Sequence, residues 1–124
     1  MVERLPFEED VLAKFLRPSP EEHAYVWSVA EKILAAIRES GKSEGMVTGS
    51  IARDTWVKGD RDLDVFMLFD PDIPREALEQ EGLALARAIA GKFTDRFYEK
   101  YAEHPYINAR IDAVDVDLVP CYRV

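Results

Sequence analysis

Two short acidic segments constrain the fold of this chain more than any other feature. Asp62-Leu63-Asp64-Val65 and Val114-Asp115-Val116-Asp117 alternate acids with apolar residues inside longer apolar runs. In a strand, alternate side chains share a face, so each pair of acids lies on one face, about 6–7 Å apart at Cα. Carboxylates on an otherwise apolar strand are costly to bury unless a charge neutralises them. The pattern therefore predicts two strands whose acidic faces require a cation.

A divalent metal is the cation that fits this pattern best. Mg²⁺ prefers one or two carboxylates, with waters and substrate phosphates completing its octahedron. If the two strands are neighbours, Asp62 and Asp64 gain a third carboxylate, and the group can hold two metals about 3.5–4 Å apart for a phosphoryl displacement. Spacing alone does not choose between Asp115 and Asp117. These two acids also fit the solvated face of an edge strand.

A Gly49-Ser50 pair lies eleven residues (51–61) before the first acidic strand. Glycine lets the backbone approach a phosphate without a Cβ in the way. Ser50 can cap the short helix that follows, whose first amides attract anions. Arg53, about one turn further, can direct a bidentate guanidinium at the same phosphates. An ordinary turn is the commoner meaning of Gly-Ser alone, but its position ahead of the acidic strand favours a phosphate site.

Two long amphipathic helices are predicted outside these segments. Ser19 is expected to be the N-cap of the first, with Pro20 at the first helical position and Glu22 at the capping-box position. The apolar residues that follow recur with a helical period, and the helix should end near Gly41. Proline opens the second helix, which we expect over residues 74–91. Residues 7–15 also have a short helical pattern.

The remaining apolar runs are predicted to be strands. Residues 63–69 are continuously apolar apart from one acid, which predicts a strand covered on both faces. Asp112-Ala113 separates the last two runs and fits the turn of a C-terminal β-hairpin. The chain is therefore expected to form one α/β (α+β) domain with a mixed sheet over residues 1–124, in which residues 1–18 form a helical extension. The predicted strands are residues 45–48, 63–69, 93–101, 106–111 and 114–122.

Charge and composition narrow the function. The 124 residues carry 16 Lys and Arg against 24 Asp and Glu, a net charge of −8. Such a chain should hold a polyanion weakly on its own, because neutralised phosphates supply most nucleic-acid affinity. The single cysteine, Cys121, excludes an internal disulfide and is expected to be a small core residue. No apolar run is long enough to span a bilayer, so we expect a cytoplasmic protein without a membrane partner.

Four blocks in order resemble the archaeal, class I CCA-adding enzymes, tRNA nucleotidyltransferases of the superfamily related to DNA polymerase β. The resemblance covers residues 20–124, with Gly-Ser followed after about ten residues by an acid–apolar–acid segment as the superfamily signature. It implies a nucleotidyltransferase fold, a mixed sheet with helices packed on one face. The blocks are Gly49–Trp56, Asp64–Phe69, Tyr101–Tyr106 and Val116–Tyr122.

The resemblance implies roles for individual residues. Asp62, Asp64 and Asp117 match the catalytic, metal-binding carboxylates, although the first is often Glu in the family. Gly49, Ser50 and Arg53 match the nucleotide-binding positions. The block around His104 matches a segment near the primer terminus, but no role is assigned to His104, and a satisfied loop histidine explains it equally well. His23 and Trp27 are ordinary helix residues.

The activity implied is transfer of nucleotides from CTP and ATP to the 3′ end of tRNA, with Mg²⁺ (or Mn²⁺) as cofactor in a two-metal mechanism. Family members continue through neck, body and tail domains, so this chain corresponds to their catalytic head and should bind tRNA weakly. Two alternatives stay open at this point. One is a minimal nucleotidyltransferase that modifies a small molecule or a protein, and the other is a non-catalytic module that binds nucleoside triphosphates.

Overall fold

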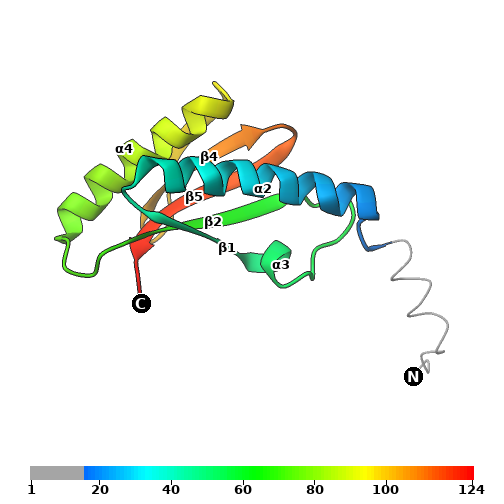
Figure 1. Ribbon diagram of the computed structural model, residues 1–124, viewed down its shortest axis with the longest axis horizontal. Coiled ribbons are helices and arrows are strands. Elements are labelled where there is room, and N and C mark those ends of the chain that lie inside the picture. The colour runs from blue at the N-terminus through cyan, green and yellow to red at the C-terminus, as the bar shows by residue number, and fades with distance from the viewer. Residues whose placement is uncertain (1–15) are drawn as a thin grey trace.

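The computed structural model describes residues 16–124, which form three helices and one five-stranded sheet (Figure 1). The predicted helix over residues 7–15 lies outside the described residues. The mixed α/β architecture predicted from the sequence is confirmed. No helix among the described residues is long and apolar enough to cross a membrane. In chain order the elements are α2 (Pro20–Ser40), β1 (Glu44–Thr48), α3 (Gly49–Ala52), β2 (Asp62–Phe69), α4 (Arg75–Phe93), β3 (Phe97–Tyr101), β4 (Pro105–Ile111) and β5 (Val114–Tyr122).

The first long helix, α2, begins and ends as predicted. The Ser19 hydroxyl accepts the Glu22 backbone N–H at 3.1 Å, and Gly41 ends the helix in the left-handed conformation. The capping box is only half formed, however. The Glu22 carboxylate binds Gly59 and Arg61 of the loop before β2, so the predicted return contact to Ser19 is replaced by a tertiary one.

The second long helix, α4, is longer than predicted. Gly91 stays helical and the helix ends at Phe93, where the next residue, Thr94, turns to extended backbone. The predicted strand over residues 93–101 was therefore wrong at its start, and β3 begins at Phe97. Phe93 packs against the core from the helix, as Phe97 does from the strand, so both apolar residues are used without a continuous strand.

The sheet has the strand order β1-β2-β5-β4-β3. The central pair, β2 and β5, is parallel, and the remaining neighbours are antiparallel. The C-terminal hairpin turns at Asp112 and Ala113, whose φ angles of 50° and 64° are those of a two-residue type I′ turn. These pairings place the two acidic segments side by side at the centre of the sheet.

Both long helices pack on the same face of the sheet (Figure 1). A Cβ at Gly45 of β1 would lie 2.7 Å from Leu34 of α2, and one at Gly82 of α4 would lie 2.5 Å from Pro120 of β5. On β2 the core face carries four buried residues, whereas Phe66 on the other face stays partly exposed. The prediction that this strand is covered on both faces is wrong for residues 16–124. The buried residues are Leu63, Val65, Met67 and Phe69.

Candidate active site

The four acids of the two central strands gather on the sheet face opposite α2 and α4. In the parallel β2–β5 ladder, Asp62 is the partner of Asp115 and Asp64 is the partner of Asp117. Alternation puts their neighbours Leu63, Val116 and Leu118 into the core, so the acids face away from it. One strand pair therefore builds a compact acidic surface from residues more than fifty positions apart in the sequence.

Electrostatic repulsion marks this surface. Burial raises the pKa of Asp64, and the neighbouring carboxylates of Asp117 and Asp115 raise it further. The pKa of Asp62 is raised by burial first, then by Asp60 and more weakly by Asp115 and Asp64. Within residues 16–124 no ion pair joins either acid to a Lys or Arg. A bound cation would relieve this repulsion.

Asn108 of β4 orients the second-strand acids. Its amide nitrogen donates to Asp117 Oδ1 at 2.7 Å and to Asp115 Oδ1 at 2.9 Å. Asn108 is 7% exposed and is the one buried polar residue among those described. No motif in the sequence pointed to it, although the signal was present: a two-residue hairpin turn at Asp112-Ala113 fixes Asn108 opposite Asp117.

The Gly49 turn lies directly against the acidic surface. Gly49 has a φ of +75°, and a Cβ there would lie only 2.4 Å from Asp64 Oδ2. Glycine is therefore required at this position both by backbone conformation and by the close approach to the carboxylate. The backbone that leads into α3 thus lies beside Asp64, as a shared phosphate and metal site would need.

Ser50 and Arg53 follow on the four-residue helix α3. The predicted capping role of Ser50 is wrong, because Ser50 lies inside α3 and the N-cap position belongs to Thr48, which makes no side-chain cap. Within residues 16–124 the Ser50 hydroxyl has no hydrogen-bond partner. Arg53 directly follows the helix and is exposed, and Ser50 is partly exposed, so neither side chain is buried away from solvent.

The donor atoms of the acidic surface suit a divalent metal, although the protein supplies only part of the ligand set. Among the described residues no three Asp, Glu, His or Cys side chains converge tightly enough to enclose an ion by themselves. Asp64 and Asp117 offer the hard carboxylate oxygens that Mg²⁺ prefers, and Mg²⁺ commonly takes only one or two carboxylates from the protein. The remaining ligands would then be waters and phosphate oxygens.

A hollow of about 390 Å³ opens beside Asp117 on the same face. Its floor is formed by Val119 of β5 and Tyr106 of β4, and its wall comes from the turn between β3 and β4. The acidic surface therefore has the Gly49 turn on one side and this partly apolar hollow on the other. The hollow is lined by Ala102, Glu103, His104, Tyr106, Asp117 and Val119.

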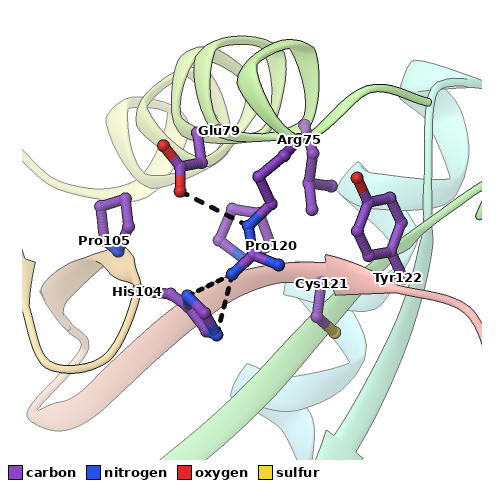
Figure 2. A pocket seen from close by; sticks show the side chains of 8 residues that line it. Arg75, Glu79, His104, Pro105, Pro120, Cys121 and Tyr122 are labelled. Carbon is purple, nitrogen blue, oxygen red and sulfur yellow. Dashed lines mark hydrogen bonds and ion pairs between the residues drawn. The ribbon is translucent and has the colours of Figure 1, made fainter.

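A second hollow, of about 120 Å³, lies at the C-terminal end of β5 and holds none of the four acids (Figure 2). In it Arg75 Nη2 lies 2.6 Å from His104 Nδ1, and Arg75 Nε lies 3.7 Å from Glu79. His104 is thus satisfied by a guanidinium. Cys121 lines this hollow half-buried, so its predicted place in the core is wrong, and burial raises the pKa of its thiol.

Comparisons with known proteins match this geometry to a family. The family model described as the nucleotidyltransferase domain matches residues 30–124, which include both acidic strands and the Gly49 turn. The chain belongs to the nucleotidyltransferase domain family. Nucleotidyltransferases of this kind use divalent metals, in agreement with the carboxylate donors of this domain.

Curated relatives of this nucleotidyltransferase domain carry a more specific name. It is 69% identical over 121 residues to a CCA-adding enzyme of Methanoregula boonei, covering 98% of this chain and 26% of that protein. It is 42% identical to a CCA-adding enzyme of Thermococcus gammatolerans, over 94% of this chain and 27% of that one. The chain thus spans about a quarter of the length of these relatives.

Solved structures share the fold of this nucleotidyltransferase domain. The structure of E. coli MS115-1 CdnC with ATP superimposes with a TM-score of 0.72 at 16% identity, over 94% of this chain and 40% of that one. Cid1, described as an RNA terminal uridylyl transferase, superimposes with a TM-score of 0.71 at 16% identity, over 91% and 34%. At such identities the likeness is one of fold.

Proposed function

We propose that this chain is the catalytic domain of a CCA-adding enzyme, which transfers nucleotides from CTP and ATP to the 3′ end of tRNA. The observation that carries the proposal is the 69% identity with the Methanoregula boonei CCA-adding enzyme across nearly the whole chain. The paired acids of β2 and β5 and the Gly49 turn support it, because they supply what nucleotidyl transfer needs. A tRNA substrate would place the reaction in the cytoplasm.

The triphosphate binds at the Gly49 turn in this proposal. The backbone at Gly49 can approach the β- and γ-phosphates without a Cβ, and the Ser50 hydroxyl and the Arg53 guanidinium add donors from α3. Arg53 can hold two phosphate oxygens at once because its donors form a planar fork. Nucleotide binding should therefore depend on these residues more than on contacts to the base.

Asp62, Asp64 and Asp117 would hold the metals, which we expect to be Mg²⁺, with Mn²⁺ as a substitute. When bound, divalent ions lower the pKa of the attacking hydroxyl and stabilise the departing pyrophosphate. Asn108 donates its amide N–H to Asp117 Oδ1, which fixes the carboxylate, and the second Asp117 oxygen would be left for a metal. Asp64 lies between Asp117 and the Gly49 turn, so it would hold metal beside both the RNA 3′-hydroxyl and the triphosphate.

The 3′ end of the RNA would approach from the other side. The hollow beside Asp117 is large enough for part of a nucleoside, and its Tyr106 ring and Val119 side chain suit the faces of a base or ribose. In this arrangement the attacking 3′-hydroxyl of the RNA lies on the Asp117 side of the acidic surface, and the triphosphate lies on the Gly49 side. With a net charge of −8 the chain should hold the rest of the tRNA weakly.

A chimaera tests the proposal. This chain replaces the matching quarter of the Methanoregula boonei relative, and the product is incubated with Mg²⁺, labelled CTP and ATP, and a tRNA that ends before CCA. We expect the tRNA to be extended by three nucleotides. A folded chimaera that binds tRNA as tightly as the relative but adds no nucleotide would overturn the proposal. Extension of a small molecule or protein acceptor in place of tRNA would also contradict it.

A further inference from the structure

An enclosed ion pair connects α2 to the residue that precedes the first acid. Arg61 Nε donates to Glu22 Oε2 at 2.9 Å, and the Gly59 N–H donates to Glu22 Oε1 at 3.3 Å. The side chains of Glu22 and Arg61 are 11% and 32% exposed. The Arg123–Glu44 pair, in contrast, is 48% and 67% exposed. The Glu22–Arg61 pair is therefore considerably more buried than the Arg123–Glu44 pair.

Arg61 lies where the two acidic strands meet. Its carbonyl accepts the Asp115 N–H at 2.9 Å, and Asp62 follows it directly in the chain. Its guanidinium carbon lies 5.2 Å from the centre of the Tyr25 ring, a cation–π contact on the same side as Glu22. Two residues of α2 thus draw this cation toward the helix, although its backbone lies among the acids.

Two of the four acids, Asp62 and Asp115, line the same hollow as Arg61. This hollow, of about 360 Å³, is lined both by the Glu22–Arg61 pair and by the acids Asp60, Asp62 and Asp115. Arg110 also lines it, from the β4 position paired with Asp115. A guanidinium released from Glu22 would meet carboxylates in this hollow and would form charge-assisted hydrogen bonds with them.

We propose that Glu22 is a positioning residue that holds the Arg61 guanidinium away from the acidic surface. The carboxylates of that surface then stay available to a divalent cation. Loss of the Glu22 charge turns Arg61 into an internal competitor for the metal. The inference rests on the metal site of the proposed function, but it concerns residues that touch neither metal nor nucleotide.

Mn²⁺ binding in the presence of ATP tests the competition, with free Mn²⁺ measured by electron paramagnetic resonance. Glu22→Gln keeps the side-chain shape and an oxygen for the Gly59 N–H but removes the charge. We expect Glu22→Gln to weaken Mn²⁺ binding by about fivefold or more, and the double variant with Arg61→Gln to return to within about twofold of the wild type. A double variant that binds Mn²⁺ as weakly as Glu22→Gln does would overturn the proposal.

A charge-matched control separates competition from long-range electrostatics. Lys58 lines the neighbouring surface hollow with Glu22 and Arg61, and it is exposed. Glu22→Gln combined with Lys58→Gln has the same net charge as the Arg61 double variant but leaves Arg61 in place. The proposal predicts no recovery of Mn²⁺ binding in this control. Equal recovery in both double variants would contradict it.

A crystal structure of the metal-free Glu22→Gln variant gives a readout that needs no metal. We expect the Arg61 guanidinium within about 4 Å of the Asp62 carboxylate, the proposed metal-binding acid of this hollow. A guanidinium that stays beside Tyr25 and the side chain at position 22, or that pairs only with Asp60 or Asp115, overturns the inference. If wild-type protein with ATP binds no Mn²⁺, the proposed metal site fails, and this structure still decides where Arg61 goes.

Discussion

Asp64 of β2 and Asp117 of β5 are direct partners in a parallel strand ladder, on the sheet face opposite the two long helices. Neither acid has a cationic partner among residues 16–124, and Asn108 donates to only one of them. Two carboxylates held this close without a counter-ion destabilise the fold unless a ligand neutralises them. The relationship is what we expect of a site maintained for binding rather than for stability.

The acidic surface predicts an unusual pH dependence of stability. The pKa of Asp64 is raised above its ordinary value of 3.8, so the native state binds protons before the unfolded chain does as pH falls. The contribution of Asp64 to stability is therefore fully present below its unfolded pKa and is lost as pH rises through its native pKa. Asp64→Asn should raise the free energy of unfolding at pH 7 without metal and lose this advantage below about pH 3.

Urea denaturation at the two pH values measures this effect. Asp95→Asn, at an exposed position between α4 and β3, is the matched control and should change stability little at either pH. Added Mg²⁺ should stabilise the wild type more than Asp64→Asn, because binding to the native state alone raises its stability. An Asp64→Asn variant that is less stable than wild type at pH 7 would show that the acids are not in net repulsion.

Gly49 should tolerate no side chain. Gly49→Ala adds a Cβ that would lie 2.4 Å from Asp64 Oδ2, at a φ of +75°. We expect a loss of more than about 2 kcal/mol in the free energy of unfolding. Gly41→Ala is the control, because Gly41 has a φ of +68° but no atom within 4 Å of the added Cβ. It should lose only the backbone part, about 1 kcal/mol, and equal losses in the two variants would argue against the close approach.

Phosphate contacts should govern nucleotide affinity. Arg53→Gln is expected to weaken ATP and CTP binding about tenfold, the value of one charge-assisted contact, and Ser50→Ala to weaken it less. Arg38→Gln, in the last turn of α2, is the control and should leave affinity unchanged. Calorimetry with all four triphosphates should give dissociation constants within about a factor of ten, or 1.4 kcal/mol. Strong preference for one base would show that this chain itself reads the base.

The hairpin turn carries a removable strain. Ala113 has a φ of 64°, a left-handed conformation that favours glycine. Ala113→Gly should raise the free energy of unfolding by about 0.5–1 kcal/mol, since relief of strain exceeds the added entropy of the unfolded chain. Ala88→Gly, at an exposed position of α4, should instead lower it by about 1 kcal/mol. Thermal denaturation of both variants distinguishes a strained turn from a neutral one.

Local patterns predicted much of this fold. The caps at Ser19 and Gly41, the strand predicted over residues 63–69 and the hairpin at Asp112-Ala113 all depend on short-range chemistry that the sequence contains. The hairpin register even fixes Asn108 opposite Asp117. The end of α4 at Phe93 was harder to predict. Gly91 is a typical helix stop signal, but the helix continues through it to Phe93.

The site depended on information that the sequence holds only indirectly. Alternation puts Asp62 with Asp64, and Asp115 with Asp117, but the β2–β5 register pairs residues more than fifty positions apart, which local patterns do not specify. Spacing therefore left the second-strand acid open, and the resemblance to CCA-adding enzymes named Asp117. Glu22 appeared to be a capping residue because its contact with Arg61 is 39 positions away in sequence.

Transfer by chimaeras that carry Asp117→Asn or Asp115→Asn tests the central claim most directly. The assay is labelled CTP addition to a tRNA ending before CCA, with triphosphate binding measured in parallel. Asp117→Asn should reduce transfer more than 100-fold, about 2.7 kcal/mol of transition-state stabilisation, and leave triphosphate binding mostly intact. Asp115→Asn should keep most of the activity. Transfer above about a tenth of wild type in Asp117→Asn, a loss below 1.4 kcal/mol, would contradict the assignment of this carboxylate to the reaction.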